Sequence, residues 1–65
     1  MINGELIRKR RIELGISQAE LAEKCGYSDK SAICHLEKGE IDDLPLTKAV
    51  LLSRALKILP TQLAK

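Results

Sequence analysis

Residues 17–39 read SQAELAEKCGYSDKSAICHLEKG and contain two short helix signals separated by a glycine. Ser17 is suited to cap a helix, and Glu20, three residues later, completes a capping box that satisfies free N–H groups of the first turn. Gly26 is suited to end this helix, because glycine readily adopts the left-handed conformation that follows many helices. A second helix is expected to begin with Ser28 or Asp29 as its cap.

This second helix is expected to run to Lys38, to end at Gly39 and to have two unequal faces. Ile33 and Leu36 lie on its narrow apolar side. The outward side is polar and consists of Lys30, Ser31, Cys34, His35 and Lys38. Two short helices joined by a three- or four-residue turn with a glycine form a helix-turn-helix, whose second helix can enter the major groove of DNA. The same spacing also occurs in helical hairpins of unrelated function.

Helix signals continue on both sides of this unit. One helix is expected over residues 4–14, ended by Gly15, and another from Pro45 to about residue 57. Pro60 breaks the pattern, and residues 61–65 are expected to form one last short turn that packs Leu63. No alternating strand pattern appears. The sequence therefore predicts a compact all-α domain of five short helices over residues 1–65, with the helix-turn-helix at about 17–38.

Composition excludes several classes of protein. The chain has 65 residues, of which 45% are hydrophobic and 31% charged, as in one small folded domain. Its longest apolar run, residues 49–52, is far shorter than the roughly 20 residues that span a bilayer, and the N-terminus has no apolar signal core. We therefore expect a cytoplasmic protein with no membrane partner.

The chain offers few groups for catalysis or metal binding. It has one histidine and one tyrosine, and no nucleophile–base pair can be assembled from its residues. Cys25, Cys34 and His35 do not make the four ligands of a structural zinc site. We expect no enzymatic activity, no metal and no cofactor.

Residues 7–39 resemble the Cro and phage-repressor type of helix-turn-helix domain, the XRE family. The resemblance depends on a Ser-Gln-x-Glu-Leu-Ala element at 17–22 and a Leu-Glu-x-Gly element at 36–39, and residues 56–63 are similar to the family's fifth helix. It implies the lambda-repressor-like fold and a sequence-specific transcription regulator. Such a protein, a phage or mobile-element repressor or a Cro-like protein, would bind a pseudo-palindromic DNA operator as a dimer. The alternative is a protein-binding module of the same fold, an antirepressor or an antitoxin with a regulatory protein partner.

The resemblance also implies roles for individual residues. The positions that face DNA bases are Lys30, Ser31, His35 and the neighbouring Cys34, and those that meet the DNA backbone are Gln18, Ser28, Lys38, Lys48, Arg8 and Arg10. Arg11 and Glu37 match an internal ion pair between the first and third helices. The position of Arg11 independently favours such a pair, because Arg11 falls on the apolar face of its helix and a charge there needs a partner. From the residues alone, a solvated surface His35 is as consistent as a base contact. Cys34 is interpreted first as a small side chain tolerated near DNA, and only secondarily as a thiol whose oxidation acts as a switch.

The chain departs from the family pattern in three places. The turn holds one extra residue, which we place at Tyr27, and this ring is expected to pack over the turn. The loop after the third helix is acidic, with Glu40, Asp42 and Asp43, so phosphate contacts at this loop are expected to be weak or to shift to Lys38 and Lys48. Because the sequence shown ends at Lys65, we expect no second domain of the kind that larger repressors use for dimerisation. Dimer contacts are therefore expected at the last turn, from Pro60, Thr61 and Leu63, and the free homodimer is expected to be weak.

Overall fold

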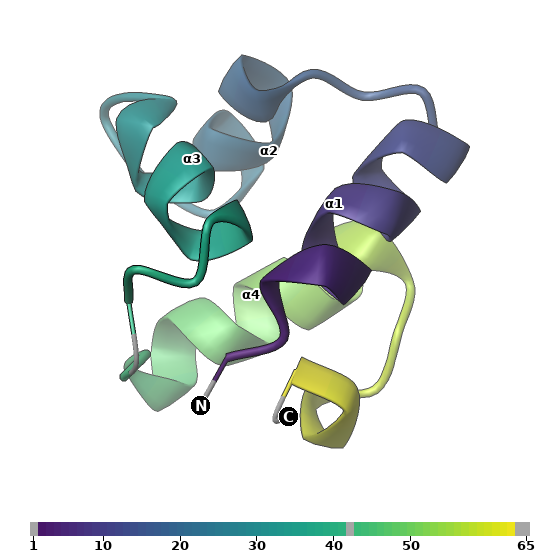
Figure 1. Ribbon diagram of the computed structural model, residues 1–65, viewed down its shortest axis with the longest axis vertical. Helices are drawn as coiled ribbons and strands as arrows, with labels where there is room; N and C mark the ends of the chain where they lie inside the picture. The colour runs from purple at the N-terminus through teal and green to yellow at the C-terminus, as the bar shows by residue number, and fades with distance from the viewer. Residues whose placement is uncertain (1, 42, 64–65) are drawn as a thin grey trace.

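The computed structural model describes residues 2–41 and 43–63. Its elements are α1 (Gly4–Glu13), α2 (Gln18–Lys24), α3 (Ser31–Glu37), α4 (Leu46–Leu56) and a 3-10 turn, η1 (Pro60–Leu63). In Figure 1, α1 crosses α4, while α2 and α3 lie together at one end of this pair. All helical elements of the described ranges thus follow the lambda-repressor-like arrangement, with four α-helices and a 3-10 turn in place of the five helices expected.

The helices begin where the sequence supplies caps. The capping box of α2 is present: Ser17 Oγ accepts from the Glu20 N–H at 3.1 Å, and Glu20 Oε1 accepts from the Ser17 N–H at 3.4 Å. Asn3 caps α1 through an acceptor bond from the Leu6 N–H, 3.2 Å long. Pro45 precedes α4 as an extended cap residue, so this helix begins one residue later than predicted.

The boundary of α3 also differs from the prediction. The residue directly before α3 is Lys30, which has helical backbone angles and makes no side-chain cap hydrogen bond, and the helix runs from Ser31 to Glu37. Neither Ser28 nor Asp29, the two cap residues predicted, therefore occupies the cap position. Asp29 Oδ1 nevertheless accepts from the Ser31 N–H at 3.3 Å, so it satisfies one free N–H group at the start of the helix.

The core lies where all elements meet. Its fully buried apolar residues are Ile7, Leu21, Ala22, Cys25, Ile33, Leu36, Leu52, Leu56 and Leu63. The two ends of the chain come together beside it (Figure 1), because the Asn3 N–H donates to the Leu63 carbonyl at 2.7 Å. None of the described helices has the length and apolarity needed to cross a membrane.

Candidate nucleic-acid interface

The turn between α2 and α3 is held in place from both sides. Gly26 has a positive φ of 77°, and the Tyr27 N–H returns to the Ala22 carbonyl at 2.9 Å, so the chain reverses directly after α2. The half-buried Tyr27 ring packs against the core. On the other side, Lys48 of α4 donates to the carbonyls of Cys25 at 3.0 Å and Gly26 at 3.3 Å.

Lys48 also lies over the Tyr27 ring, with Nζ 4.7 Å from the ring centroid, a cation–π contact. Burial raises the pKa of the Cys25 thiol above its usual value, and the nearby Lys48 charge opposes this shift. Burial likewise raises the pKa of the Tyr27 hydroxyl. Both groups are therefore neutral at pH 7, and Lys48 provides the charge at this turn. We call this group of contacts the turn clamp: it consists of Lys48, the Tyr27 ring and the carbonyls of Cys25 and Gly26, which accept hydrogen bonds from Lys48.

A second network fixes the far end of α3. Arg11 of α1 binds Glu37 with two bonds, Nε to Oε2 at 2.7 Å and Nη2 to Oε1 at 3.3 Å. Gln18 of α2 donates from Nε2 to the same Oε1 at 3.1 Å, and Arg11 Nη1 donates to the Ile16 carbonyl at 3.0 Å. The side chains of Arg11 and Glu37 are only 14% and 6% exposed. One carboxylate thus joins the first three helices.

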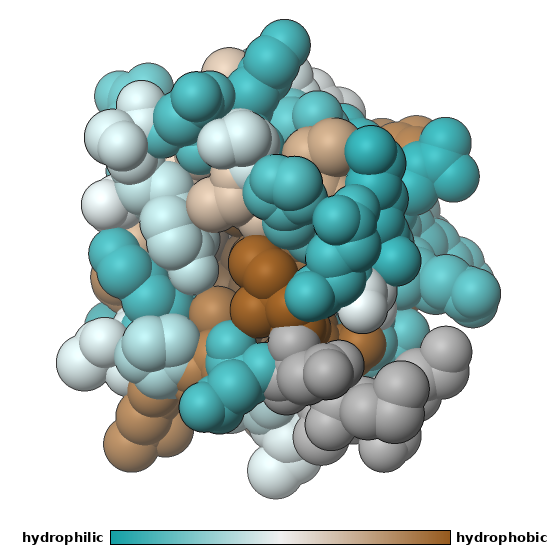
Figure 2. Space-filling view, turned by 60° about the vertical axis from the view of Figure 1, so that its left-hand side comes forward, coloured by the Kyte–Doolittle hydropathy of each residue, from teal (hydrophilic) through white to brown (hydrophobic). Residues whose placement is uncertain are grey.

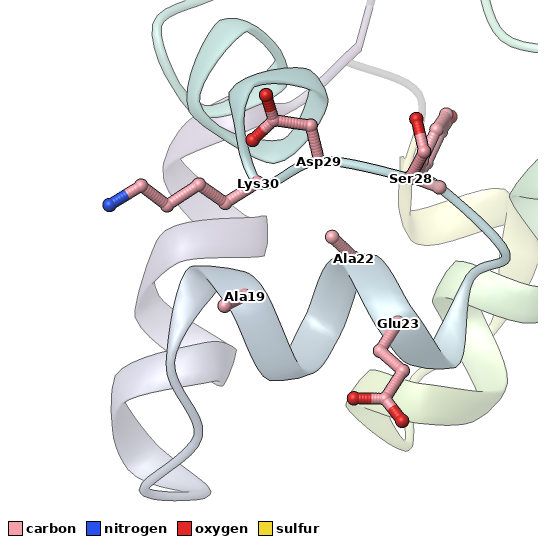
Figure 3. Close-up of a pocket in the computed structure, with 7 residues that line it drawn as sticks. Ala19, Ala22, Glu23, Ser28, Asp29 and Lys30 are labelled. Atoms are coloured by element: carbon pink, nitrogen blue, oxygen red, sulfur yellow. The ribbon is translucent and has the colours of Figure 1, made fainter.

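With its apolar side buried and its C-terminal end held by Glu37, α3 presents its polar side to solvent. Lys30, Ser31, His35 and Lys38 are exposed, and Cys34 is half-buried. In Figure 3 the Lys30 side chain extends away from the turn, while Ala22 of α2 points toward Asp29, just before α3. Figure 2 shows the side of the molecule on which α2 and α3 lie, where hydrophilic and near-neutral side chains surround a hydrophobic patch near the centre of the view. The base-facing residues expected from the resemblance are therefore gathered on one face.

The residues expected at the DNA backbone do not all have free polar groups. Arg8, Ser28 and Lys38 are exposed. Arg10 is half-buried and donates to the Leu56 carbonyl and to Glu13, each at 3.2 Å. Gln18 is half-buried, and its side-chain amide donates to Glu37 rather than pointing freely into solvent.

Two expectations need correction. Lys48 is engaged in the turn clamp. Because α4 packs on α2, the Lys48 ammonium group lies beside the carbonyls of Cys25 and Gly26 at the end of α2 and donates to both. We therefore no longer expect it at a phosphate. Leu63 is 3% exposed within one chain and belongs to the core, so it cannot form a dimer contact. Pro60 and Thr61 remain exposed; Asp42 of the acidic loop and residues 64–65 lie outside the described residues.

One contact at the site was not predicted. His35 Nδ1 lies 3.3 Å from Oε2 of Glu40, the residue directly after the Gly39 stop. Gly39, with a φ of 76°, turns the chain back so that the Glu40 N–H donates to the His35 carbonyl at 3.0 Å. The signal for this contact was present, because a glycine stop returns the next residue toward the last turn of the helix. Among the described residues no group of three metal-ligating side chains comes together.

Comparison with known proteins shows to which family the chain belongs. A helix-turn-helix family model (HTH_3) matches residues 7–63. The chain belongs to this XRE-type helix-turn-helix family. No curated protein sequence matches it significantly.

Solved structures of similar fold include regulators from phage and bacteria. The P22 c2 repressor, solved with a synthetic operator, is 37% identical with a TM-score of 0.88, over 100% of this chain and 96% of the repressor. The restriction-modification controller C.AhdI from Aeromonas hydrophila is 33% identical, with a TM-score of 0.79 over 92% and 88% of the two chains. The biofilm regulator SinR, solved with DNA, is 29% identical, with a TM-score of 0.82 over 95% and 97%.

Proposed function

We propose that this chain is a sequence-specific DNA-binding transcription regulator whose α3 lies in the major groove of an operator. The observation that supports this is the division of α3 into a buried side and an exposed polar side. Glu37 fixes its C-terminal end to α1 and α2, and Lys48 fixes the end of α2, where the turn to α3 begins, to α4. A recognition helix must be rigid relative to the domain, since base contacts require placement within a fraction of an ångström. The DNA complexes of the P22 c2 repressor and SinR support the same reading.

The exposed side chains divide by chemistry. Lys30 can donate to guanine O6 and N7, Ser31 can donate or accept, and His35 reaches the groove from the next turn. Arg8, Ser28 and Lys38 are the groups that we assign to phosphates, which set the register of the protein on the duplex. Cys34, half-buried between Ser31 and Lys38, is left as a minor contact at the base edge.

We further propose that two copies bind a pseudo-palindromic operator and block polymerase, as a phage or mobile-element repressor or a Cro-like protein does. The two recognition helices would then lie about 34–36 Å apart, in successive major grooves. Pro60 and Thr61, at the exposed end of η1, are the residues assigned to the contact between the copies. The compartment is the cytoplasm, where the operator lies, and no catalytic activity is assigned.

Fluorescence anisotropy with labelled duplexes tests this function. The wild type is titrated at several salt concentrations against a random-sequence duplex and against DNA that flanks its own gene. We expect much tighter binding to the flanking DNA, with a steep salt dependence. Lys30→Glu is expected to weaken specific binding at least tenfold, whereas Lys24→Glu, the same charge change on the exposed side of α2, has a smaller effect.

Weak and equal binding of both duplexes would reject this function. The helix-turn-helix would then serve a protein partner, as in an antirepressor or an antitoxin. A solved complex of SinR with SinI, whose SinR chain is 29% identical to this chain, provides a precedent for that alternative.

A further inference from the structure

His35 and Glu40 are joined twice at the end of α3. The Glu40 N–H donates to the His35 carbonyl at 3.0 Å, and Glu40 Oε2 lies 3.3 Å from His35 Nδ1. The backbone bond follows from the left-handed Gly39, so the position of the carboxylate is part of the helix end. Both side chains are 51% exposed, so about half of the imidazole surface is open to solvent on the polar side of α3.

The chemistry of the pair determines where the imidazole holds its proton. An exposed carboxylate is ionised at neutral pH and can only accept hydrogen bonds. His35 Nδ1 must therefore donate to it. In a neutral imidazole one nitrogen donates and the other accepts, so His35 Nε2 is then an acceptor.

We propose that Glu40 is a positioning residue that sets the base preference of His35. The inference rests on the proposed function, in which His35 faces the major groove. There adenine N6 and cytosine N4 are donors, whereas guanine and thymine present acceptors. With Nδ1 bound to Glu40, His35 selects adenine or cytosine. Without Glu40, His35 Nε2 becomes free to hold the proton and to donate to guanine or thymine. Glu40 thus changes the base preference of the protein indirectly, through the position of the proton on His35.

The tautomer can be measured without DNA. The chain has one histidine, so the ring nitrogens of the 15N-labelled protein give an unambiguous long-range proton–nitrogen NMR spectrum. At pH 8 we expect the Nδ1–H form to predominate in the wild type, and the Nε2–H form to predominate in Glu40→Ala. The matched control is Glu13→Ala, which removes a carboxylate from the exposed Arg10–Glu13 pair and should leave the histidine spectrum unchanged. A wild-type ring that is mainly Nε2–H or cationic at pH 8, or one that Glu40→Ala does not change, overturns the inference.

The base preference is measured by selection from a pool of random duplexes. His35→Ala first identifies the position that the imidazole reads, as the one where preference is lost. At that position the wild type should favour adenine or cytosine, and Glu40→Ala should shift the ratio toward guanine or thymine at least fivefold. An unchanged ratio overturns the role of Glu40 while leaving the proposed function intact. If the wild type selects no sequence at all, the proposed function itself fails and the specificity role fails with it, whatever the NMR spectrum shows.

Discussion

Glu37 joins three helices through one carboxylate, and its removal should affect the whole domain. Glu37→Ala leaves the guanidinium of Arg11, 14% exposed, without its charged partner. A buried charge left in this way costs about 3–5 kcal/mol. A domain of this length has a total stability of only roughly 3–10 kcal/mol. We therefore expect Glu37→Ala to lower the urea midpoint strongly or to unfold the chain, as followed by circular dichroism.

The matched variant for this test is Glu37→Gln. Its amide oxygen can still accept from Arg11 and Gln18, so we expect a smaller loss of stability than in Glu37→Ala. If both variants unfold at the wild-type midpoint, the network does not support α3.

Gly4 is required by a close approach between α1 and α3. A Cβ at this position would meet the Leu36 carbonyl oxygen and would lie 2.7 Å from that of Glu37. Both atoms belong to the backbone, so the helices themselves would have to move apart. Alanine gains about 1 kcal/mol in helix propensity over glycine, but overpacking of this kind costs about 1–3 kcal/mol or more.

We therefore expect Gly4→Ala to lower the free energy of unfolding by about 1–3 kcal/mol, measured by urea denaturation. Glu5→Ala, on the exposed side of the same turn, is the control and should change it by less than about 1 kcal/mol. A Gly4→Ala variant more stable than the wild type would mean that the two helices separate easily.

Each helix ends in the same way, but one of them does so without glycine. A left-handed residue follows α1, α2 and α3 as Gly15, Gly26 and Gly39, and follows α4 as Lys57 with a φ of 57°. The Ile58 N–H then donates to the Ser53 carbonyl at 3.0 Å, as in a Schellman motif. A side chain makes this conformation costly by about 1–2 kcal/mol, and glycine avoids that cost.

Lys57→Gly should therefore stabilise the protein by about 0.5–1 kcal/mol, because the greater freedom of glycine in the unfolded chain offsets part of the gain. This corresponds to a rise in Tm of about 2–8 °C in a domain of this size. Lys57→Ala removes the same charge without relieving the backbone and should give no rise. Equal Tm changes in the two variants would show that charge, not conformation, is responsible.

The turn clamp connects α4 to the helix-turn-helix, and Lys48→Met tests it. Methionine keeps the apolar part of the side chain but loses the two hydrogen bonds and the cation–π contact. We expect a loss of about 1–3 kcal/mol in urea denaturation. Removal of a phosphate contact lowers the salt slope of DNA binding by about 0.9. Because Lys48 binds the turn and not a phosphate, Lys48→Met should weaken DNA binding by loosening the turn. The slope of affinity against salt concentration should stay unchanged.

Lys38→Met provides the contrast, since Lys38 is exposed and assigned to a phosphate. It should reduce the salt slope with little change in stability. If Lys48→Met instead lowers the slope and leaves stability unchanged, Lys48 is a DNA contact after all.

The helices could be predicted from the sequence because their signals are local. The capping box at Ser17 and the glycine stops involve hydrogen bonds between residues only a few positions apart, and they placed α1 and α2 correctly to within about one residue. The predicted end of α4, at about residue 57, is also within one residue of the observed end at Leu56. The left-handed conformation of Lys57 was not predicted, because a lysine gives no signal for it. The start of α3 was less certain, because two adjacent residues could serve as its cap.

The contacts that position the site could not be predicted in this way. Lys48 and Cys25 are 23 residues apart, and Gln18 and Glu37 are 19 apart. Such pairs form only when helices pack at a particular angle, which the residue pattern does not specify. The Arg11–Glu37 pair was expected because of the family resemblance, together with the position of Arg11 on an apolar face.

At the scale of the whole molecule, the surface assigned to the contact with a second copy is small. Among the described residues, the exposed large apolar ones are Ile12, Leu46, Leu51 and Leu59, and of these only Leu59 neighbours that surface in the sequence. A stable interface buries about 800 Å² per partner, which would be about a fifth of the 4206 Å² of this chain. Pro60 and Thr61, together with the neighbouring Leu59, which is 65% exposed, provide much less than that. We therefore expect a monomer at micromolar concentration in analytical ultracentrifugation, and two copies on a full operator.

Leu59→Asp tests the contact between these two copies. A charge at the interface should weaken binding to a full operator at least tenfold, while binding to a single half-site remains unchanged because α3 is not affected. Ile12→Asp makes the same change at an apolar residue of α1 that is 56% exposed, and it should alter both affinities equally or not at all. A tight wild-type dimer at micromolar concentration would contradict the weak association. Equal loss at half-site and full operator in Leu59→Asp would place the contact elsewhere on the molecule.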